Sequence, residues 1–194
     1  ELPSVNPADL RQRLLAILAA DAVGYSRLMA GDDRGTVAAL DAARAVFRHR
    51  IEAGQGRVID MAGDSVLAVF ETAAGAVTAA IAVQQALGAS TGAVPQDRRM
   101  HFRIGIHMGD VIEKADGTVY GDGVNIASRL CAVAEAGGIV VSDAVHGAVR
   151  DRIVASFVDQ GEQPMKNIAH LVHAFQLKPT EPTPAPAPAP VPVP

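Results

Sequence analysis

The sequence predicts an α+β fold, in which a ferredoxin-like β-α-β-β-α-β core is followed by further β and α elements. Short apolar or alternating runs, typical of strands, are twice separated by long amphipathic stretches, typical of helices. Residues 57–61 and 65–70 are two strand-like runs with only a tight turn between them, which indicates a hairpin in the middle of the core. Hydrophobic residues make up 49% of the chain, so a substantial core is expected.

The first half of the chain supplies the opening of this core. Residues 14–20 form an apolar run that ends at Asp21, and we expect a buried strand with a carboxylate at its C-terminal edge. A long helix is predicted over residues 33–52, because its apolar residues fall on one stripe. The hairpin strands follow, and the Ala-rich residues 72–87 are predicted as the second helix.

The second half continues with alternating strands and shorter helices. Residues 100–108 alternate between apolar and polar side chains, residues 110–113 continue the strand, and Asp116-Gly117 is a strong hairpin signal. This alternation places Arg103 on the polar face, where we expect it in solvent or at a dimer surface. The remaining predictions are a helix over 123–136, a strand over 139–141, a helix over 143–150, and strands over 153–158 and 171–177.

The ends of the chain differ from its middle. We expect an N-terminal extension over residues 1–12, one folded domain over 13–178, and a Pro/Ala-rich linker over 179–194, which holds eight of the twelve prolines. Alternating prolines cannot donate backbone hydrogen bonds to a helix or sheet, so the linker is predicted to be extended and to lead to a further fused domain. A ligand for a proline-binding module is the alternative, but basic flanking residues are absent.

Composition excludes several classes of partner. The net charge of −4 argues against a nucleic-acid polymer or an anionic membrane surface as the main partner. The sequence has no run of about twenty apolar residues, so we expect no membrane contact. Cys131 is the only cysteine, which excludes an internal disulfide and a Cys-based zinc site and indicates a reducing cytoplasm.

Two carboxylates are the first candidates for chemistry. Asp21 ends the first strand, and Asp64 lies in the hairpin turn beside it in the predicted topology. A pair of aspartates on adjoining strands offers the oxygen ligands that Mg²⁺ or Mn²⁺ prefers. Taken singly, Asp21 reads as a helix cap and Asp64 as a turn residue; taken together, they favour a metal site.

Two further segments offer groups that bind nucleotides. The backbone N–H groups of a strand-to-helix turn can hold phosphates, and the turn here consists of Ala22, Val23, Gly24, Tyr25 and Ser26. Asn125 and Arg129 lie four residues apart, so both project from one helix face, where Asn can orient a sugar and Arg can hold phosphate. An ordinary exposed pair on an amphipathic helix has the same spacing.

The order and spacing of three segments resemble the catalytic domain of class III adenylate/guanylate cyclases of the bacterial type. These segments are residues 20–26, 62–70 and 121–130, and the resemblance covers about residues 14–178. The resemblance implies the class III cyclase fold and conversion of ATP, or less favourably GTP, to the 3′,5′-cyclic monophosphate and pyrophosphate in intracellular signalling.

The same resemblance implies a homodimer with its active sites between subunits. Asp21 and Asp64 of one protomer would bind two Mg²⁺ or Mn²⁺ ions, one activating the ribose 3′-hydroxyl and one holding the triphosphate. Asn125 of the other protomer would contact the ribose, and its Arg129 would contact the α-phosphate.

Three positions depart from the family pattern. Adenine-selective members usually carry Lys where this chain has Asp60, and Asp where it has Thr118; both residues are therefore candidates for contact with the base. Lys166 is the nearest candidate for a terminal-phosphate contact, although the resemblance places Ile168 at that position.

These departures leave alternatives open. A degenerate cyclase-like domain that binds nucleotide, or only dimerises, and regulates a fused partner is the second hypothesis. Another two-metal enzyme on the same core, such as a diguanylate cyclase or a polymerase palm, is disfavoured because no Gly-Gly-Asp-Glu-like turn is present.

Overall fold

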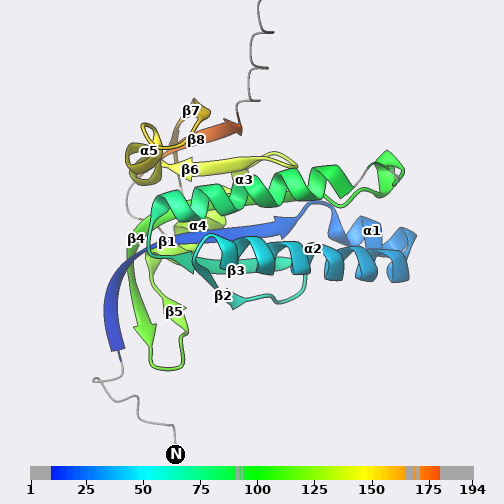
Figure 1. The fold of residues 1–194 in the computed structure, drawn as a ribbon, viewed down its shortest axis with the longest axis horizontal. Helices are drawn as coiled ribbons and strands as arrows, with labels where there is room; N and C mark the ends of the chain where they lie inside the picture. Colours follow the sequence, from blue (N-terminus) through cyan, green and yellow to red (C-terminus); the bar gives the residue numbers. More distant parts are fainter. Residues whose placement is uncertain (1–9, 91, 93, 165–167, 169–170, 180–194) are drawn as a thin grey trace, which may run out of the picture.

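The computed structural model describes residues 10–90, 92, 94–164, 168 and 171–179 and contains one eight-stranded sheet covered by helices (Figure 1). The helices and strands in chain order are β1 Leu10–Ala22, α1 Tyr25–Gly31, α2 Asp33–Ala53, β2 Gly56–Asp60, β3 Ser65–Phe70, α3 Ala73–Ser90, the 3₁₀ helix η2 Gln96–Arg98, β4 Phe102–Lys114, β5 Val119–Tyr120, α4 Asp122–Val133, β6 Ile139–Ser142, α5 Asp143–Val149, β7 Ala155–Gln163 and β8 Val172–Pro179.

The strand order is β2-β3-β1-β4-β6-β8-β7, with β5 paired to β4. The first four strands of this order are antiparallel neighbours, which is the arrangement that a β-α-β-β-α-β unit produces. Strand β6 joins β4 in parallel, and β8 and β7 then extend the sheet. The predicted α+β class and the ferredoxin-like core with additional C-terminal elements are therefore confirmed.

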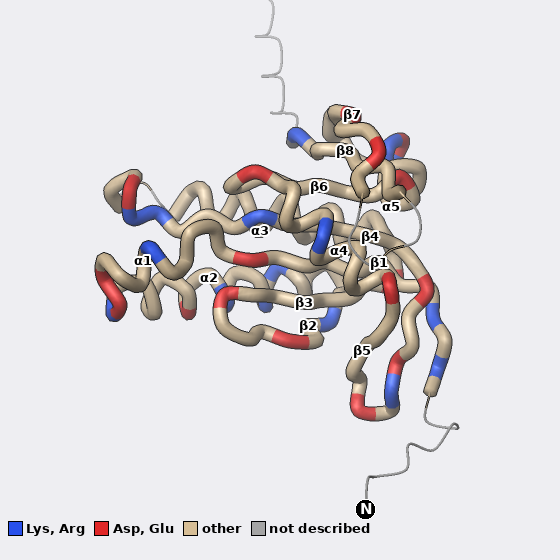
Figure 2. Tube along the Cα trace, turned by 180° about the vertical axis from the view of Figure 1, so that it is seen from behind, with Lys and Arg blue, Asp and Glu red and all other residues tan. Residues whose placement is uncertain are grey.

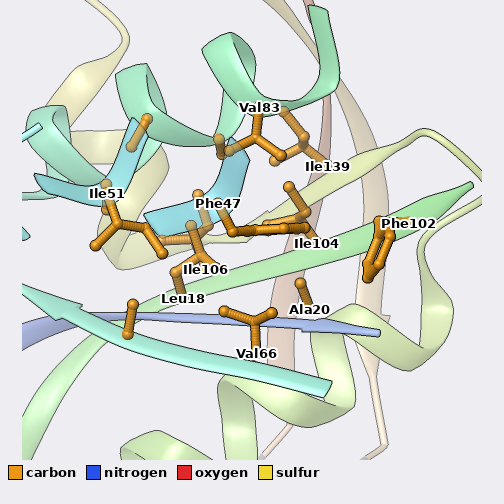
Figure 3. Packing of buried hydrophobic residues seen from close by; sticks show 14 of the residues in the cluster. Leu18, Ala20, Phe47, Ile51, Val66, Val83, Phe102, Ile104, Ile106 and Ile139 are labelled. Carbon is orange, nitrogen blue, oxygen red and sulfur yellow. The ribbon is translucent and has the colours of Figure 1, made fainter. Parts of the chain in front are cut away.

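The larger core lies between the sheet and helices α2, α3 and α5. Figure 3 shows Phe47 and Ile51 of α2 facing Leu18, Ile104 and other sheet residues, all buried. Phe47 and Phe102 meet edge to face with ring centroids 5.0 Å apart. Because aromatics are scarce in this chain, such contacts and many small Ala and Val side chains fill the core.

Helix α4 covers the opposite face of the sheet. Its buried side chains pack on β1 through Ala127 and Cys131 and on β6 and β8 through Ile126 and Leu130. The helix comes very close to β4 at Gly105, where an added Cβ would lie 2.2 Å from the backbone nitrogen of Cys131. Only glycine permits this approach, which fixes the depth at which α4 lies on the sheet.

The predicted elements are present, with shifted ends. Strand β1 begins at Leu10, so residues 10–12 of the predicted N-terminal extension belong to the sheet. Strand β8 reaches Pro179, the first residue of the predicted linker, and residues 180–194 lie outside the described part. Strands β7 and β8 pair along their length, which carries β7 to Gln163, beyond its predicted end.

Helix α3 is, among the described residues, the one helix long and apolar enough by composition to cross a membrane. It lies along the sheet beside α2 (Figure 1), and its side chains at Ala76, Val77, Ala80 and Val83 are buried in the core. These contacts are those of a core helix, for which a high apolar content is expected.

We expect Gly105→Ala to destabilise the fold by about 2–4 kcal/mol, because its methyl group would collide with the α4 backbone. Gly88→Ala is the matched control: its Cβ would meet nothing within 4 Å, and alanine favours the α3 helix by about 0.5–1 kcal/mol. Urea unfolding of the three proteins measures both changes. Equal stability of the wild type and Gly105→Ala would contradict the close approach.

Candidate active site

The two candidate metal-binding carboxylates lie at neighbouring ends of β1 and β3. Asp21 pairs with Ser65 across the antiparallel ladder, and Asp64 is the residue directly before Ser65. The backbone N–H of Ala22 donates to the carbonyl of Asp64 over 3.2 Å, which ties the two segments together. The structure thus brings together the two strand ends that the sequence suggested.

Asp21 forms an ion pair with Arg103, its direct neighbour on β4. The Arg103 Nε lies 2.6 Å from one carboxylate oxygen, and a terminal nitrogen lies 3.2 Å from the other. A further nitrogen donates to the carbonyl of Ala132 in α4. The expectation that Arg103 is merely solvated is therefore wrong, while its place at a dimer surface stays a prediction. Arg103 neutralises Asp21, and the hydrogen bond to this carboxylate raises the pKa of the guanidinium.

Asp64 is held in a tight turn. Gly63 has a φ of +56°, and the N–H of Ser65 donates to the carbonyl of Ala62 over 3.0 Å. The Asp64 side chain is half-buried, and within the described residues its carboxylate has no hydrogen-bond or ion-pair partner. A carboxylate in this state has oxygen atoms available for a cation.

The segment after Asp21 offers fewer donors than the sequence suggested. The N–H of Ala22 is bound to Asp64, and that of Val23 donates to the carbonyl of His101 over 2.8 Å. Gly24 has a φ of +68° and precedes α1, so the N–H groups of Gly24, Tyr25 and Ser26 have no carbonyl partner within the described part of the chain. Of the five backbone N–H groups predicted to contact phosphate, only these three are therefore available.

Asp60 lies on the same face of the sheet as Asp21 because of an irregularity in β2. Val58 pairs with Ala68 and Asp60 with Leu67, so Ile59 is an extra residue in the ladder. Such a bulge turns the next side chain to the other face. Asp60 and Asp21 both line a cavity of about 180 Å³ between the sheet and α4, together with Ser65, Leu67, Val124, Ser128, Cys131 and neighbouring backbone.

Thr118 lies in the hairpin between β4 and β5, away from this cavity. Its N–H donates to the Asp116 carboxylate over 2.9 Å, and the hydrogen bonds from Thr118 lower the pKa of Asp116. Arg57 of β2 holds the hairpin by donating to the carbonyl of Gly117 over 2.8 Å and by pairing with Glu113. The chain itself therefore does not bring Thr118 to Asp60.

Asn125 and Arg129 project from α4 into solvent. Both are exposed, and neither has a side-chain partner among the described residues. The α4 residues that line the cavity of Asp21 are Val124, Ser128 and Cys131 instead. Within one chain, Asn125 and Arg129 are thus not brought to the two carboxylates.

Comparison with known proteins identifies the family. The family model described as "Adenylate and Guanylate cyclase catalytic domain" matches residues 11–179. The chain belongs to this family. A protein of Rhizobium meliloti (strain 1021) named "Putative adenylate cyclase 3" is 42% identical over 173 residues, which are 89% of this chain but only 29% of that protein.

Solved structures agree with this assignment of the cyclase domain. An adenylate/guanylate cyclase/hydrolase from Silicibacter pomeroyi has a TM-score of 0.82 at 38% identity, covering 88% of this chain and 99% of that one. The adenylyl cyclase CyaB from P. aeruginosa has a TM-score of 0.78 at 22% identity, covering 89% and 97%. The second likeness is at a level of identity that concerns the fold alone.

The two carboxylates of this cyclase domain would fit a metal site that substrate completes. Among the described residues no three His, Cys, Asp or Glu side chains gather into a metal centre. Asp21 and Asp64 offer hard oxygen ligands at adjoining strand ends, and Mg²⁺ commonly uses one or two carboxylates plus phosphate oxygens. The donor set therefore fits Mg²⁺ or Mn²⁺, and Arg103 now supplies the positive charge at Asp21.

Ile168 and Cys131 of the cyclase domain pack in its apolar clusters. Lys166 lies outside the described residues, and Ile168 packs partly buried against the apolar cluster of α4, β6 and β8. Cys131 is 2% exposed, and desolvation raises the pKa of its thiol to about 12. The thiol therefore stays protonated near neutral pH and is a core side chain.

Proposed function

We propose that this domain converts ATP to 3′,5′-cyclic AMP and pyrophosphate with divalent metal ions at a homodimer interface. The observation that carries the proposal is the position of Asp21 and Asp64 at adjoining strand ends of a cyclase-family domain. In the reaction, the ribose 3′-oxygen forms a bond to the α-phosphorus and loses its proton, while the bond from that phosphorus to pyrophosphate breaks.

The two carboxylates would hold two Mg²⁺ or Mn²⁺ ions. Bound ions supply Lewis acidity that activates the 3′-hydroxyl and charge that stabilises the leaving pyrophosphate. Asp64 lies in the hairpin turn beside Asp21 and has no hydrogen-bond or ion-pair partner among the described residues, while Asp21 would exchange its ion pair with Arg103 for the incoming positive charge. The backbone amides of Gly24, Tyr25 and Ser26 lie on the same segment and would bind phosphate oxygens.

Arg103 is a second cation for the triphosphate. If a metal ion neutralised Asp21, the guanidinium of Arg103 would lose its partner and would need another anion. Two phosphate oxygens beside the metal site would meet this need, because a guanidinium can donate to both at once. This role offsets the apolar Ile168 at the position where family members carry a phosphate-binding lysine.

Asn125 and Arg129 would act on the substrate held by the partner subunit. Both are exposed and unpaired within the described residues, on a helix whose other face is fixed by the core. From there Asn125 would orient the ribose, and Arg129 would stabilise charge on the α-phosphate as it develops. A homodimer supplies two such sites.

Asp60 and Thr118 are the proposed contacts for the base. An ionised Asp60 accepts hydrogen bonds, so it can take the N6 donor of adenine, and the Thr118 hydroxyl can donate to N1. Asp60 could equally accept from both guanine donors. The name of the relative from Rhizobium meliloti favours ATP.

The surroundings of the domain follow from the same proposal. Figure 2 shows acidic and basic positions interspersed along the chain rather than gathered into one basic surface, in keeping with a small nucleotide as partner. We propose that the enzyme acts in cytoplasmic signalling and that the Pro/Ala-rich residues 180–194 link it to a further domain.

Asp64→Asn should lower cyclase activity by at least about a hundredfold, because it removes charge from the metal pair without changing size. Asp97→Asn, which changes an exposed carboxylate in η2, is the control and should keep wild-type activity. The measurement is cyclic nucleotide formed from ATP or GTP with Mn²⁺. Near-normal turnover of Asp64→Asn would refute the metal assignment, and no product from the wild type would favour a domain that only binds nucleotide or dimerises.

Asp64→Ala and Arg129→Ala should each be nearly inactive alone and active when mixed. A heterodimer keeps one complete site and one site that lacks both groups, so an equal, fully exchanged mixture should reach about one quarter of wild-type activity. Subunit exchange is followed separately with two fluorescent labels. Absence of recovery despite exchange would show that both groups act within one chain.

Asp60→Lys should raise the use of ATP relative to GTP, because an ammonium group repels the guanine donors and can donate to adenine N1. Asp60→Asn, which removes charge without reversing it, should give a smaller change. The ratio of kcat/KM for the two nucleotides is measured in all three proteins. A wild type that prefers GTP by more than about tenfold, roughly 1.4 kcal/mol, would reverse the assignment of the base.

A further inference from the structure

We infer that Arg44 of α2 is a positioning residue that fixes the orientation of Asp64. A terminal nitrogen of its guanidinium donates to the carbonyl of Gly63 and lies 3.4 Å from the carbonyl of Met61. These two carbonyls belong to the turn between β2 and β3 that presents Asp64. The inference rests on the proposed function, in which Asp64 is a metal ligand.

The contact acts on the peptide that carries Asp64. The Gly63 carbonyl belongs to the planar peptide unit that joins Gly63 to Asp64, so holding this oxygen fixes the rotation of that plane. The carbonyl on the other side of Asp64 accepts the N–H of Ala22 in β1. Asp64 is therefore clamped between α2 and β1, and the direction of its Cα–Cβ bond follows from these two contacts.

The clamp restrains a turn that is otherwise open to solvent. Ala62 and Gly63 are exposed, and a Cβ at Gly63 would meet nothing within 4 Å, so the side-chain packing of the turn is limited to Met61, which lies partly buried against the larger core. Its internal restraint is the bond from the Ser65 N–H to Ala62. A turn with so few contacts opens easily unless a neighbouring element holds it.

The surroundings of the Arg44 side chain are not those expected of a residue that stabilises the fold. Its Nε is buried and has no hydrogen-bond partner, and its nearest carboxylate is that of exposed Asp41, at 3.6 Å. A buried donor without a partner is unfavourable, and an apolar side chain of similar length would avoid this cost. Residues that break a packing rule in this way are typical of functional positions.

Arg48, one helical turn further along α2, provides a matched control. It contacts the same turn only through the sulfur of Met61, at 3.7 Å, and its side chain is exposed. It touches neither carbonyl that Arg44 holds. Arg44→Met and Arg48→Met therefore remove the same charge from the same helix but only the first releases the turn.

The test measures the turn and the metal site separately in the whole chain. Hydrogen exchange of the Ser65 amide in metal-free protein should be at least about tenfold faster in Arg44→Met and unchanged in Arg48→Met. The Mn²⁺ concentration for half-saturation, measured by electron paramagnetic resonance with a non-cyclisable ATP analogue, should rise at least about fivefold in Arg44→Met only. Arg44→Lys keeps the charge but reaches fewer acceptors, so its Ser65 exchange rate and Mn²⁺ half-saturation concentration should lie between those of the wild type and Arg44→Met. This variant replaces Arg44→Met in the test if Arg44→Met does not fold.

The outcomes separate the inference from the proposed function. Equal Ser65 exchange and equal Mn²⁺ affinity in the Arg44 and Arg48 variants would overturn the positioning role. Faster exchange at all core amides of Arg44→Met would also overturn it, because the effect would be general destabilisation. If the wild type binds no Mn²⁺ while Arg44→Met opens the turn, the metal assignment of Asp64 fails and the contact remains as a structural one.

Discussion

The whole site depends on the pairing of β1 with a neighbour on each side. Strand β1 lies between β3 and β4 at the centre of the sheet, and its last residues set Asp21 against Arg103 and next to the turn of Asp64. Successive side chains of β1 are buried alternately in the cores on the two faces of the sheet. This packing fixes the register, because a slip by one residue would move each side chain to the opposite core. The packing that holds β1 in register therefore also determines where Asp21 lies relative to Arg103 and Asp64.

The two faces of the sheet have different tasks. Helices α2 and α3 cover the larger core, and α2 also reaches over the sheet edge to the turn of Asp64 through Arg44. Helix α4 covers the other face, where Asp21 and Asp60 share a cavity. The close approach at Gly105 holds α4 to that face, so the direction in which Asn125 projects is a consequence of packing.

Features that depend on local pattern could be predicted from the sequence. The apolar run ending at Asp21 and the hairpin turn at Asp64 determined that the two carboxylates lie at neighbouring strand ends, and the structure agrees. Features that depend on strand register and on tertiary contacts could not be predicted from the sequence. The alternation of apolar and polar residues predicts that Arg103 lies on the polar face of its strand, but it does not predict that Asp21 is its partner. That partner is determined by the register of β1 against β4.

The irregularity in β2 shows the same limit. Strict alternation would place Asp60 on the face of Val58, and only the extra residue at Ile59 turns it toward Asp21. The five-residue sequence of β2 contains no signal that predicts such a bulge. The contact of Arg44 with the turn likewise joins residues that are 19 positions apart, on a helix that spacing describes only as amphipathic.

In the proposed function, the Asp21–Arg103 ion pair lies at the metal site and opens when metal ions and nucleotide bind. The most direct measurement is the ¹⁵N NMR signal of the Arg103 Nε–H during titration with Mg²⁺ and a non-cyclisable ATP analogue, repeated with Mn²⁺. The account predicts a change in chemical shift with Mg²⁺ and strong paramagnetic broadening with Mn²⁺, both lost in Asp64→Asn. An Arg103 signal that is unchanged by either metal at saturating nucleotide would contradict the account.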